Sequence, residues 1–102
     1  MTQARFTTVA SGDQSPVLAV SGDIDLANVD EFESAMSKAR NGSPALTVDL
    51  TDVSYCASAA VRALFAVAAD AQLTMIVRPT GSIVTLLGIS GLDRVATVVR
   101  KD

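Results

Sequence analysis

The apolar residues of this chain fall in short runs that alternate with stretches of helical spacing, and this alternation most limits the folds open to it. Short apolar runs occupy residues 17–20, 45–50 and 73–77, each of a length typical of a strand. Between them, at residues 29–39 and 58–68, apolar residues recur at the spacing of a helix with one buried face. Such alternation requires right-handed crossovers, so we expect an α/β domain with an at least partly parallel sheet. The first run is almost continuously apolar, which predicts a strand buried on both faces, and residues 45–50 are expected to form a second buried strand.

Weaker patterns complete the two ends of the chain. Residues 6–9 predict a first strand at an edge of the sheet, and residues 95–99 predict the last strand. Residues 82–88 predict a short third helix. Turns are expected where glycine and proline gather, at residues 11–16 and 91–94. The predicted order is β-β-α-β-α-β-α-β in a single domain over residues 1–102, with about five strands in a mixed sheet and helices packed on it.

The ends of the first predicted helix carry the expected signals. Asn28, followed three residues later by Glu31, has the pattern of a capping box. Acidic residues lie in the first turns and basic residues in the last, as the helix dipole favours: Asp30, Glu31 and Glu33, then Lys38 and Arg40. Asn41 and Gly42 predict where the helix ends.

The composition excludes several classes of function. The net charge is −3 and Lys and Arg do not cluster, so we expect no nucleic-acid partner and no membrane insertion. The longest apolar stretch, residues 59–69, contains Arg62 and is too short to span a bilayer. The N-terminus lacks an apolar signal segment, which predicts a cytoplasmic protein. The single cysteine, Cys56, is expected to be a small buried hydrophobe.

The stretch from Val48 to Leu64 passes from a strand into a helix, with Ser58 at the turn between them. A helix N-terminus favours negative charge, so this is a suitable place to bind or carry a phosphate. The chain has no histidine and Arg62 cannot take the proton of Ser58, so a serine hydrolase is excluded and we expect no enzyme activity. Ser58 is then either the N-cap of the helix or a site modified by an outside enzyme.

Four carboxylates could gather at neighbouring strand ends: Asp23, Asp25, Asp49 and Asp52. We expect these side chains to form hydrogen bonds within turns and to cap them. The alternative is that they recognise a partner or provide an environment for phosphate transfer. A metal site and nucleotide hydrolysis at this acidic turn are the weakest readings, because the spacing of a calcium loop is missing. We expect no cofactor and no metal.

Three motifs, in order and suitably spaced over nearly the whole length, resemble the STAS domain, the fold of bacterial anti-sigma factor antagonists. Residues 20–25, Val-Ser-Gly-Asp-Ile-Asp, are similar to the family's L-x-G-x-L-D turn. Residues 48–53, Val-Asp-Leu-Thr-Asp-Val, resemble its V-x-D-L-s-x-V strand. Residues 91–94, Gly-Leu-Asp-Arg, are close to its C-terminal G-L motif.

The family's central turn typically reads D-S-[ST]-G-L, and its first serine is phosphorylated by a cognate anti-sigma kinase. Residues 57–61 here read Ala-Ser-Ala-Ala-Val, so the resemblance implies Ser58 as the acceptor. The acidic residue of the pattern is replaced by Ala57 and the glycine by Ala60. Losing a carboxylate removes repulsion against a phosphate but also removes a potential recognition element for the kinase.

The resemblance implies a protein that binds an anti-sigma factor, itself a serine kinase of the histidine-kinase-like type, and so releases a sigma factor and regulates transcription. It implies a partner-binding surface made of Asp23, Asp25, Ala57, Ser58, Ala59 and Arg62, on a monomer or weak dimer. Two alternatives stay open. One is a regulatory binding module without phosphorylation, and the other is a STAS subunit of a membrane transport assembly.

Overall fold

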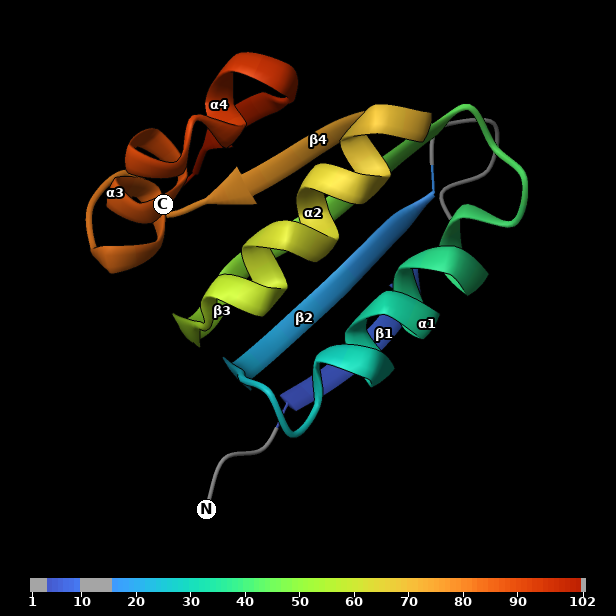
Figure 1. Ribbon diagram of the computed structural model, residues 1–102, viewed down its shortest axis with the longest axis horizontal. Helices are drawn as coiled ribbons and strands as arrows, with labels where there is room; N and C mark the ends of the chain where they lie inside the picture. The colour runs from blue at the N-terminus through green and yellow to red at the C-terminus, as the bar shows by residue number, and fades with distance from the viewer. Residues whose placement is uncertain (1–3, 10–15, 102) are drawn as a thin grey trace.

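The computed structural model describes residues 4–9 and 16–101, and its elements follow the predicted order (Figure 1). Along the described chain they are β1 (Ala4–Val9), β2 (Val17–Ile24), α1 (Val29–Arg40), β3 (Ala45–Cys56), α2 (Ser58–Asp70), β4 (Gln72–Val77), α3 (Ser82–Ser90), α4 (Leu92–Val95) and β5 (Thr97–Arg100). The turn predicted at residues 11–16 lies outside the described residues, apart from Pro16.

The turn predicted at residues 91–94 is a short helix instead, which corrects that expectation. Gly91 takes the left-handed conformation (φ 82°) that ends α3. The chain then makes one further helical turn, α4, in which the N–H of Ala96 donates to the carbonyl of Leu92 (3.1 Å). Leu92 is fully buried, so this turn packs against the core.

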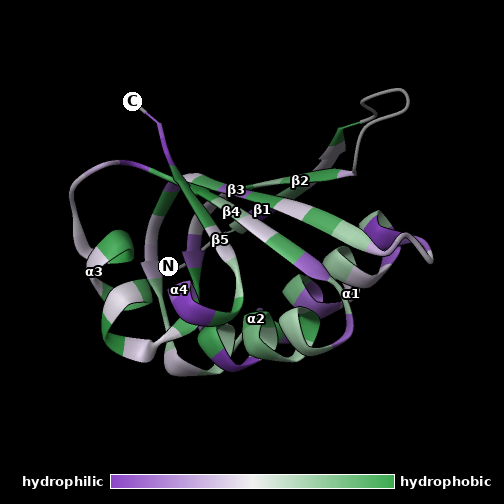
Figure 2. Cartoon of the chain, turned by 90° about the horizontal axis from the view of Figure 1, so that it is seen from above, coloured by the Kyte–Doolittle hydropathy of each residue, from purple (hydrophilic) through white to green (hydrophobic). Residues whose placement is uncertain are grey.

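The sheet is mixed, and its strands stand in sequence order, β1-β2-β3-β4-β5. β1 is an edge strand antiparallel to β2, while β2, β3, β4 and β5 run parallel. When every parallel crossover has the same hand and advances in the same direction, the helices fall on one face of the sheet. Figure 2 shows this arrangement, with the helices on one side and the other side of the sheet uncovered.

The one-sided cover overturns the prediction that the first apolar run forms a strand buried on both faces. In β2, Leu18 and Val20 are buried, whereas Val17 and Ala19 between them are only half-buried. The same alternation holds in β3, where Leu46, Val48 and Leu50 point toward the helices. The core therefore lies in a single layer between sheet and helices.

The two long helices bury the faces that their spacing predicts. Phe32, Met36 and Ala39 of α1 are buried, and the ring of Phe32 stacks on Phe6 of β1 with 5.9 Å between centroids. α1 ends at Asn41, which takes the left-handed conformation (φ 46°) expected of a helix stop. In α2 the buried residues are Ala60, Val61, Ala63 and Leu64.

β3 is longer than the strands beside it, and its irregular ladder to β2 accounts for two of the extra residues. It has 12 residues against the 8 of β2. The register shifts between Ala19 and Ser21, and again between Gly22 and Asp23, so that β3 gains a residue at each place. The shifts change the alternation near the end of β3: Tyr55 is exposed and Cys56 is buried.

Candidate functional site

The predicted binding residues come from two neighbouring turns at the edge of the sheet where β2 and β3 end. We call residues 25–28, between β2 and α1, the first corner, and residues 56–60, from the end of β3 into the first turn of α2, the second corner. Ile24 pairs with Cys56, and the N–H of Ala57 donates to the carbonyl of Ile24 (2.8 Å). The structure thus brings together the two corners that the sequence pointed to.

The side chain of Asn28 fastens the first corner to the strand before it. Its Oδ1 accepts from the N–H of Asp25 and its Nδ2 donates to the carbonyl of Asp23, both at 2.9 Å. Asn28 is the buried polar residue of the described chain, at 9% exposure. Sequence reasoning had given it another task.

The capping box predicted for Asn28 and Glu31 is wrong. Asn28 precedes α1, but its backbone (φ −125°, ψ 7°) lies outside the extended region usual for an N-cap, and no side chain caps the helix. The side chain therefore turns back toward the strand rather than forward to the helix amides. Glu31 is exposed in the first turn, where it and Asp30 complement the helix dipole.

Asp25 serves the first corner itself, as expected of a turn residue. Its Oδ1 accepts from the N–H of Ala27 (2.9 Å). Asp23 lies half-buried in β2, opposite Tyr55 of β3. Both carboxylates predicted for partner binding therefore lie where the two corners meet.

The second corner leaves the start of α2 without a side-chain acceptor. The N-cap is Ala57, in extended conformation (φ −73°, ψ 162°), and it has no side-chain oxygen to offer. Ser58 is the first residue of the helix and exposed, so its prediction as the N-cap is wrong by one position. The first turn of α2 also contains no acidic residue. This helix end therefore combines amides without a side-chain cap, a dipole without an acidic neighbour in the first turn, and the exposed hydroxyl of Ser58.

The remaining predicted residues extend this surface. Ala59 is half-buried in the first turn of α2, and Arg62, one turn further, is exposed. Sequence reasoning missed two exposed apolar side chains, Leu26 of the first corner (77% exposed) and Tyr55 next to the second (53%). The sequence contains a signal for both: a large apolar residue within the first corner, and another in the strand just before the second. Exposed apolar side chains next to polar groups are typical of a protein-binding surface.

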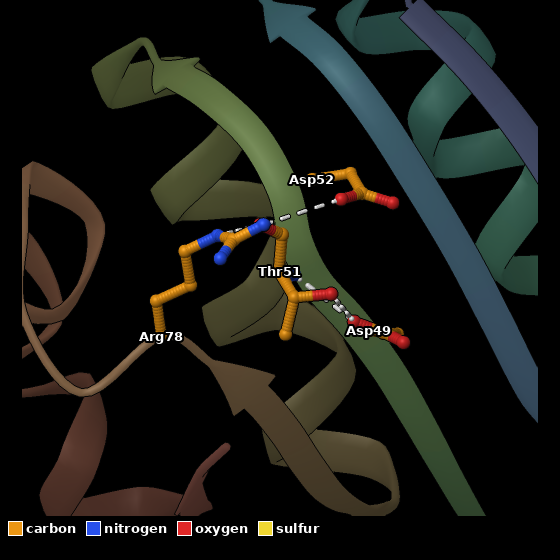
Figure 3. Close-up of polar contacts among 4 residues, drawn as sticks. All are labelled: Asp49, Thr51, Asp52 and Arg78. Carbon is orange, nitrogen blue, oxygen red and sulfur yellow. Dashed lines mark hydrogen bonds and ion pairs between the residues drawn. The ribbon is translucent and has the colours of Figure 1, made fainter. Parts of the chain in front are cut away.

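The other two carboxylates do not join the corners. Asp49 and Asp52 lie within β3, not at its end, so their predicted place at neighbouring strand ends is wrong. The Oδ1 of Asp49 accepts from the N–H (3.0 Å) and the hydroxyl (2.7 Å) of Thr51. Arg78 forms an ion pair with Asp52 (3.6 Å) and donates through Nε to the carbonyl of Thr51 (2.7 Å), as Figure 3 shows.

Cys56 lies beneath the second corner as the predicted small buried hydrophobe. It is 8% exposed, and burial raises the pKa of its thiol to about 11. The thiol is therefore protonated and weakly reactive at neutral pH.

Over residues 4–9 and 16–101, no group of three or more His, Cys, Asp or Glu side chains is placed to hold a metal ion. In the same residues, none of the helices has the length and apolar character needed to cross a membrane.

The fold and the paired corners define a small α/β domain with an exposed hydroxyl at an uncapped helix start. A family model described as "Mlab, STAS domain" matches residues 7–100, so the chain belongs to the STAS domain family. The predicted family is thereby confirmed. A search of the curated proteins finds no match.

Solved structures share the fold. An anti-sigma factor antagonist from Mycobacterium paratuberculosis matches with a TM-score of 0.86 at 22% identity, over 97% of this chain and 87% of that one. The anti-sigma factor antagonist SpoIIAA in its unphosphorylated form matches with a TM-score of 0.73 at 14% identity, over 95% of this chain and 90% of that one. The Bacillus cell fate determinant SpoIIAA in its phosphorylated form matches with a TM-score of 0.60 at 17% identity, over 95% of this chain and 93% of that one.

Proposed function

We propose that this protein is an anti-sigma factor antagonist, which binds an anti-sigma factor through the two corners and so releases a sigma factor. The observation that carries the proposal is the second corner, where exposed Ser58 begins an uncapped helix close to the first corner. The similar folds of two anti-sigma factor antagonists support it. The protein acts as a cytoplasmic binding module and not as an enzyme, since no histidine is present to activate Ser58.

The contacts divide between apolar anchors and polar groups. Leu26 and Tyr55 supply exposed apolar area, and an aromatic anchor of this kind is typical of protein interfaces. Asp23, Asp25 and Arg62 supply charges of both signs around them. Ala57 and Ala59 present a surface of small residues that lets a partner approach the helix start closely.

Phosphorylation of Ser58 by the anti-sigma factor is the proposed switch. A phosphate adds about −1.5 to −2 charges, and the N-terminus of α2 is suited to hold them. The same charge, placed inside the interface, weakens binding through repulsion and desolvation. SpoIIAA, which has this fold, exists in both unphosphorylated and phosphorylated forms.

The test compares serine variants at the corner and away from it. The protein is incubated with the candidate anti-sigma kinase and ATP, and intact-mass spectrometry counts phosphates. Titration calorimetry then measures binding for Ser58→Glu and for Ser34→Glu, an exposed control on α1. We expect one phosphate, lost in Ser58→Ala, and at least about tenfold weaker binding for Ser58→Glu alone.

Other outcomes select the alternatives. Binding without a phosphate, equal for Ser58→Ala and Ser58→Glu, indicates a binding module that is not controlled by phosphorylation, as the replacements Ala57 and Ala60 would permit. Absence of binding to any anti-sigma factor overturns the proposal itself.

A second candidate, a STAS subunit of a membrane transport assembly, is favoured by one observation, the "Mlab" description of the matching family model. In that case the two corners bind a cytoplasmic subunit of the assembly. Affinity purification of the tagged chain from native cells, with the cytosol and the detergent-solubilised membranes analysed separately, decides between them. An integral membrane complex in the second fraction supports the transport role, and a soluble kinase in the first supports the antagonist.

A further inference from the structure

The face of the sheet that carries no helix consists of two aligned rows of side chains. Each row can be followed from β1 to β5 through residues that pair directly in neighbouring strands. One row contains Thr7, Ala19, Asp49, Ile76 and Val99, and the next contains Val9, Val17, Thr47, Thr74 and Thr97. We call these ten residues the open face. In β2, β3, β4 and β5 the residues between the two rows, Leu18, Val48, Met75 and Val98, pack in the core, so the open face lies on the bare side of the sheet in Figure 2.

The open face is poorer in charge than a solvated sheet face usually is. Nine of its ten side chains are uncharged, and they are small or β-branched. The exception is Asp49, whose Oδ1 already accepts two hydrogen bonds from Thr51. Val9 and Val99, at opposite edges of the sheet, are 46% and 42% exposed. Of the nine uncharged residues, five are apolar and four are threonines, whose methyl groups can also pack in an interface.

A charged rim borders this surface at one end. The next register row contains Arg5, Ser21 and Asp52. Arg78, which follows β4, forms its ion pair with Asp52 on this border (Figure 3). An uncharged centre with charged residues at its edge is the usual anatomy of a protein–protein interface.

We propose that the open face binds a second copy of this chain, so that two sheets pack face to face in a symmetric dimer. The two-fold axis lies in the interface and runs parallel to the rows, midway between them. It places each row of one chain opposite the other row of the second chain. Asp49 then lies opposite Thr47 of the second chain, whose hydroxyl can donate to the carboxylate, and Ile76 lies opposite Thr74. Two sheets packed in this way stand about 10 Å apart, with side chains of these sizes filling the layer.

The area of the open face sets the strength of the dimer. Five strands are about 24 Å wide, and the two rows cover about 14 Å along the strands. The face therefore offers about 330 Å² per chain, or about 650 Å² for the pair, which is below the area of a stable specific interface and typical of a weak one. This area fits a weak dimer that forms with rising concentration.

Other occupants fit the open face less well. The two rows contain no lysine or arginine, so they offer no site for the phosphates of nucleic acid or anionic lipid. The corners lie at the strand ends and not on this face, so the dimer leaves Ser58 accessible. The inference is thus independent of the proposed function.

Sedimentation velocity of the purified chain, from about 10 µM to about 1 mM, tests the proposal. We expect a shift from monomer to dimer within this range. Thr74→Arg and Val99→Arg place a charge on the open face and should each weaken the dimer at least about tenfold. Val95→Arg is the matched control, because Val95 is 54% exposed on α4, on the opposite side of the sheet.

Circular dichroism establishes that each variant is folded, and Thr97→Arg, at the exposed sheet edge, replaces Thr74→Arg if the latter is not. A monomer over the whole range overturns the proposal. So does a dimer that survives both open-face substitutions, or one that Val95→Arg dissociates.

Discussion

The two corners lie side by side but are built in opposite ways. In the first, the side chains of Asn28 and Asp25 bond to backbone groups of the corner and of the end of β2, and acidic residues occupy the first turn of α1. In the second, Ala57 offers no side-chain acceptor and the first turn of α2 has no acidic residue. The first corner satisfies its own polar groups, whereas the second leaves a helix end available to an outside partner.

The contrast also shows how one corner can hold the other in place. The N–H of Ala57 donates to Ile24, the last residue of β2, so the second corner is held by the strand that the first corner fastens. Side chains of the first corner thereby fix the backbone of the second without occupying it. Substitutions in the two corners should therefore have very different consequences for folding and for binding.

The largest effect is expected from Asn28→Ala. Removing this buried side chain deletes its hydrogen bonds to the N–H of Asp25 and the carbonyl of Asp23, which should lower the free energy of unfolding by about 3 kcal/mol. Urea denaturation measures the change. Glu31→Ala is the control: a working capping box would make it cost about 1 kcal/mol, whereas the structure predicts a loss below about 0.5 kcal/mol.

Cys56, beneath the second corner, should make stability fall at high pH. Its folded pKa of about 11 lies above the unfolded value of 9.0, so the unfolded chain loses the thiol proton first. The contribution of the protonated thiol to the free energy of unfolding is complete below pH 9.0. It decreases between pH 9.0 and about 11, by about 2 kcal/mol at the upper end. Urea denaturation at a series of pH values should show a shallower decline for Cys56→Ala; an equal decline contradicts burial of the thiol.

A cap can be added to the second corner by substituting Ala57. The backbone of Ala57 is already extended as an N-cap requires, so the hydroxyl of Ala57→Thr can accept from an amide of the first turn. We expect the free energy of unfolding of Ala57→Thr to exceed that of Ala57→Val by about 1 kcal/mol, because valine has the same shape but no acceptor. Thermal or urea unfolding measures the difference. Equal stability of the pair would mean that the helix start already has a partner for its amides.

The sequence predicts the order of elements well because the hydrophobic period that reveals a strand or helix is local. It predicts poorly whatever depends on the arrangement of those elements. The half-burial of Val17 and Ala19 follows from strand order, which places all helices on one face and cannot be read from the run itself. The position of Asp52 within β3, away from the corners, depends on register shifts against β2.

The candidate site shows the same limit at the scale of single residues. Motifs place Ser58 and Asp25 at adjoining turns correctly, because the ends of parallel strands share an edge. Asn28 matches a capping box in sequence, yet its backbone angles turn the side chain toward the strand. The exposure of Leu26 and Tyr55 is a property of the folded surface, which composition alone does not reveal.

The smallest effect is expected from Ser58→Ala, and its small size is informative. As the first residue of α2, exposed and outside the cap position, Ser58 should be replaceable with a change of less than about 0.5 kcal/mol in the free energy of unfolding. A serine that capped the helix would cost about 1 kcal/mol. Chemical denaturation of the parent and variant decides between these values. A change within the smaller limit means that stability does not require a hydroxyl at this position. The serine is then free to serve binding or modification, in contrast to Asn28, which the fold requires.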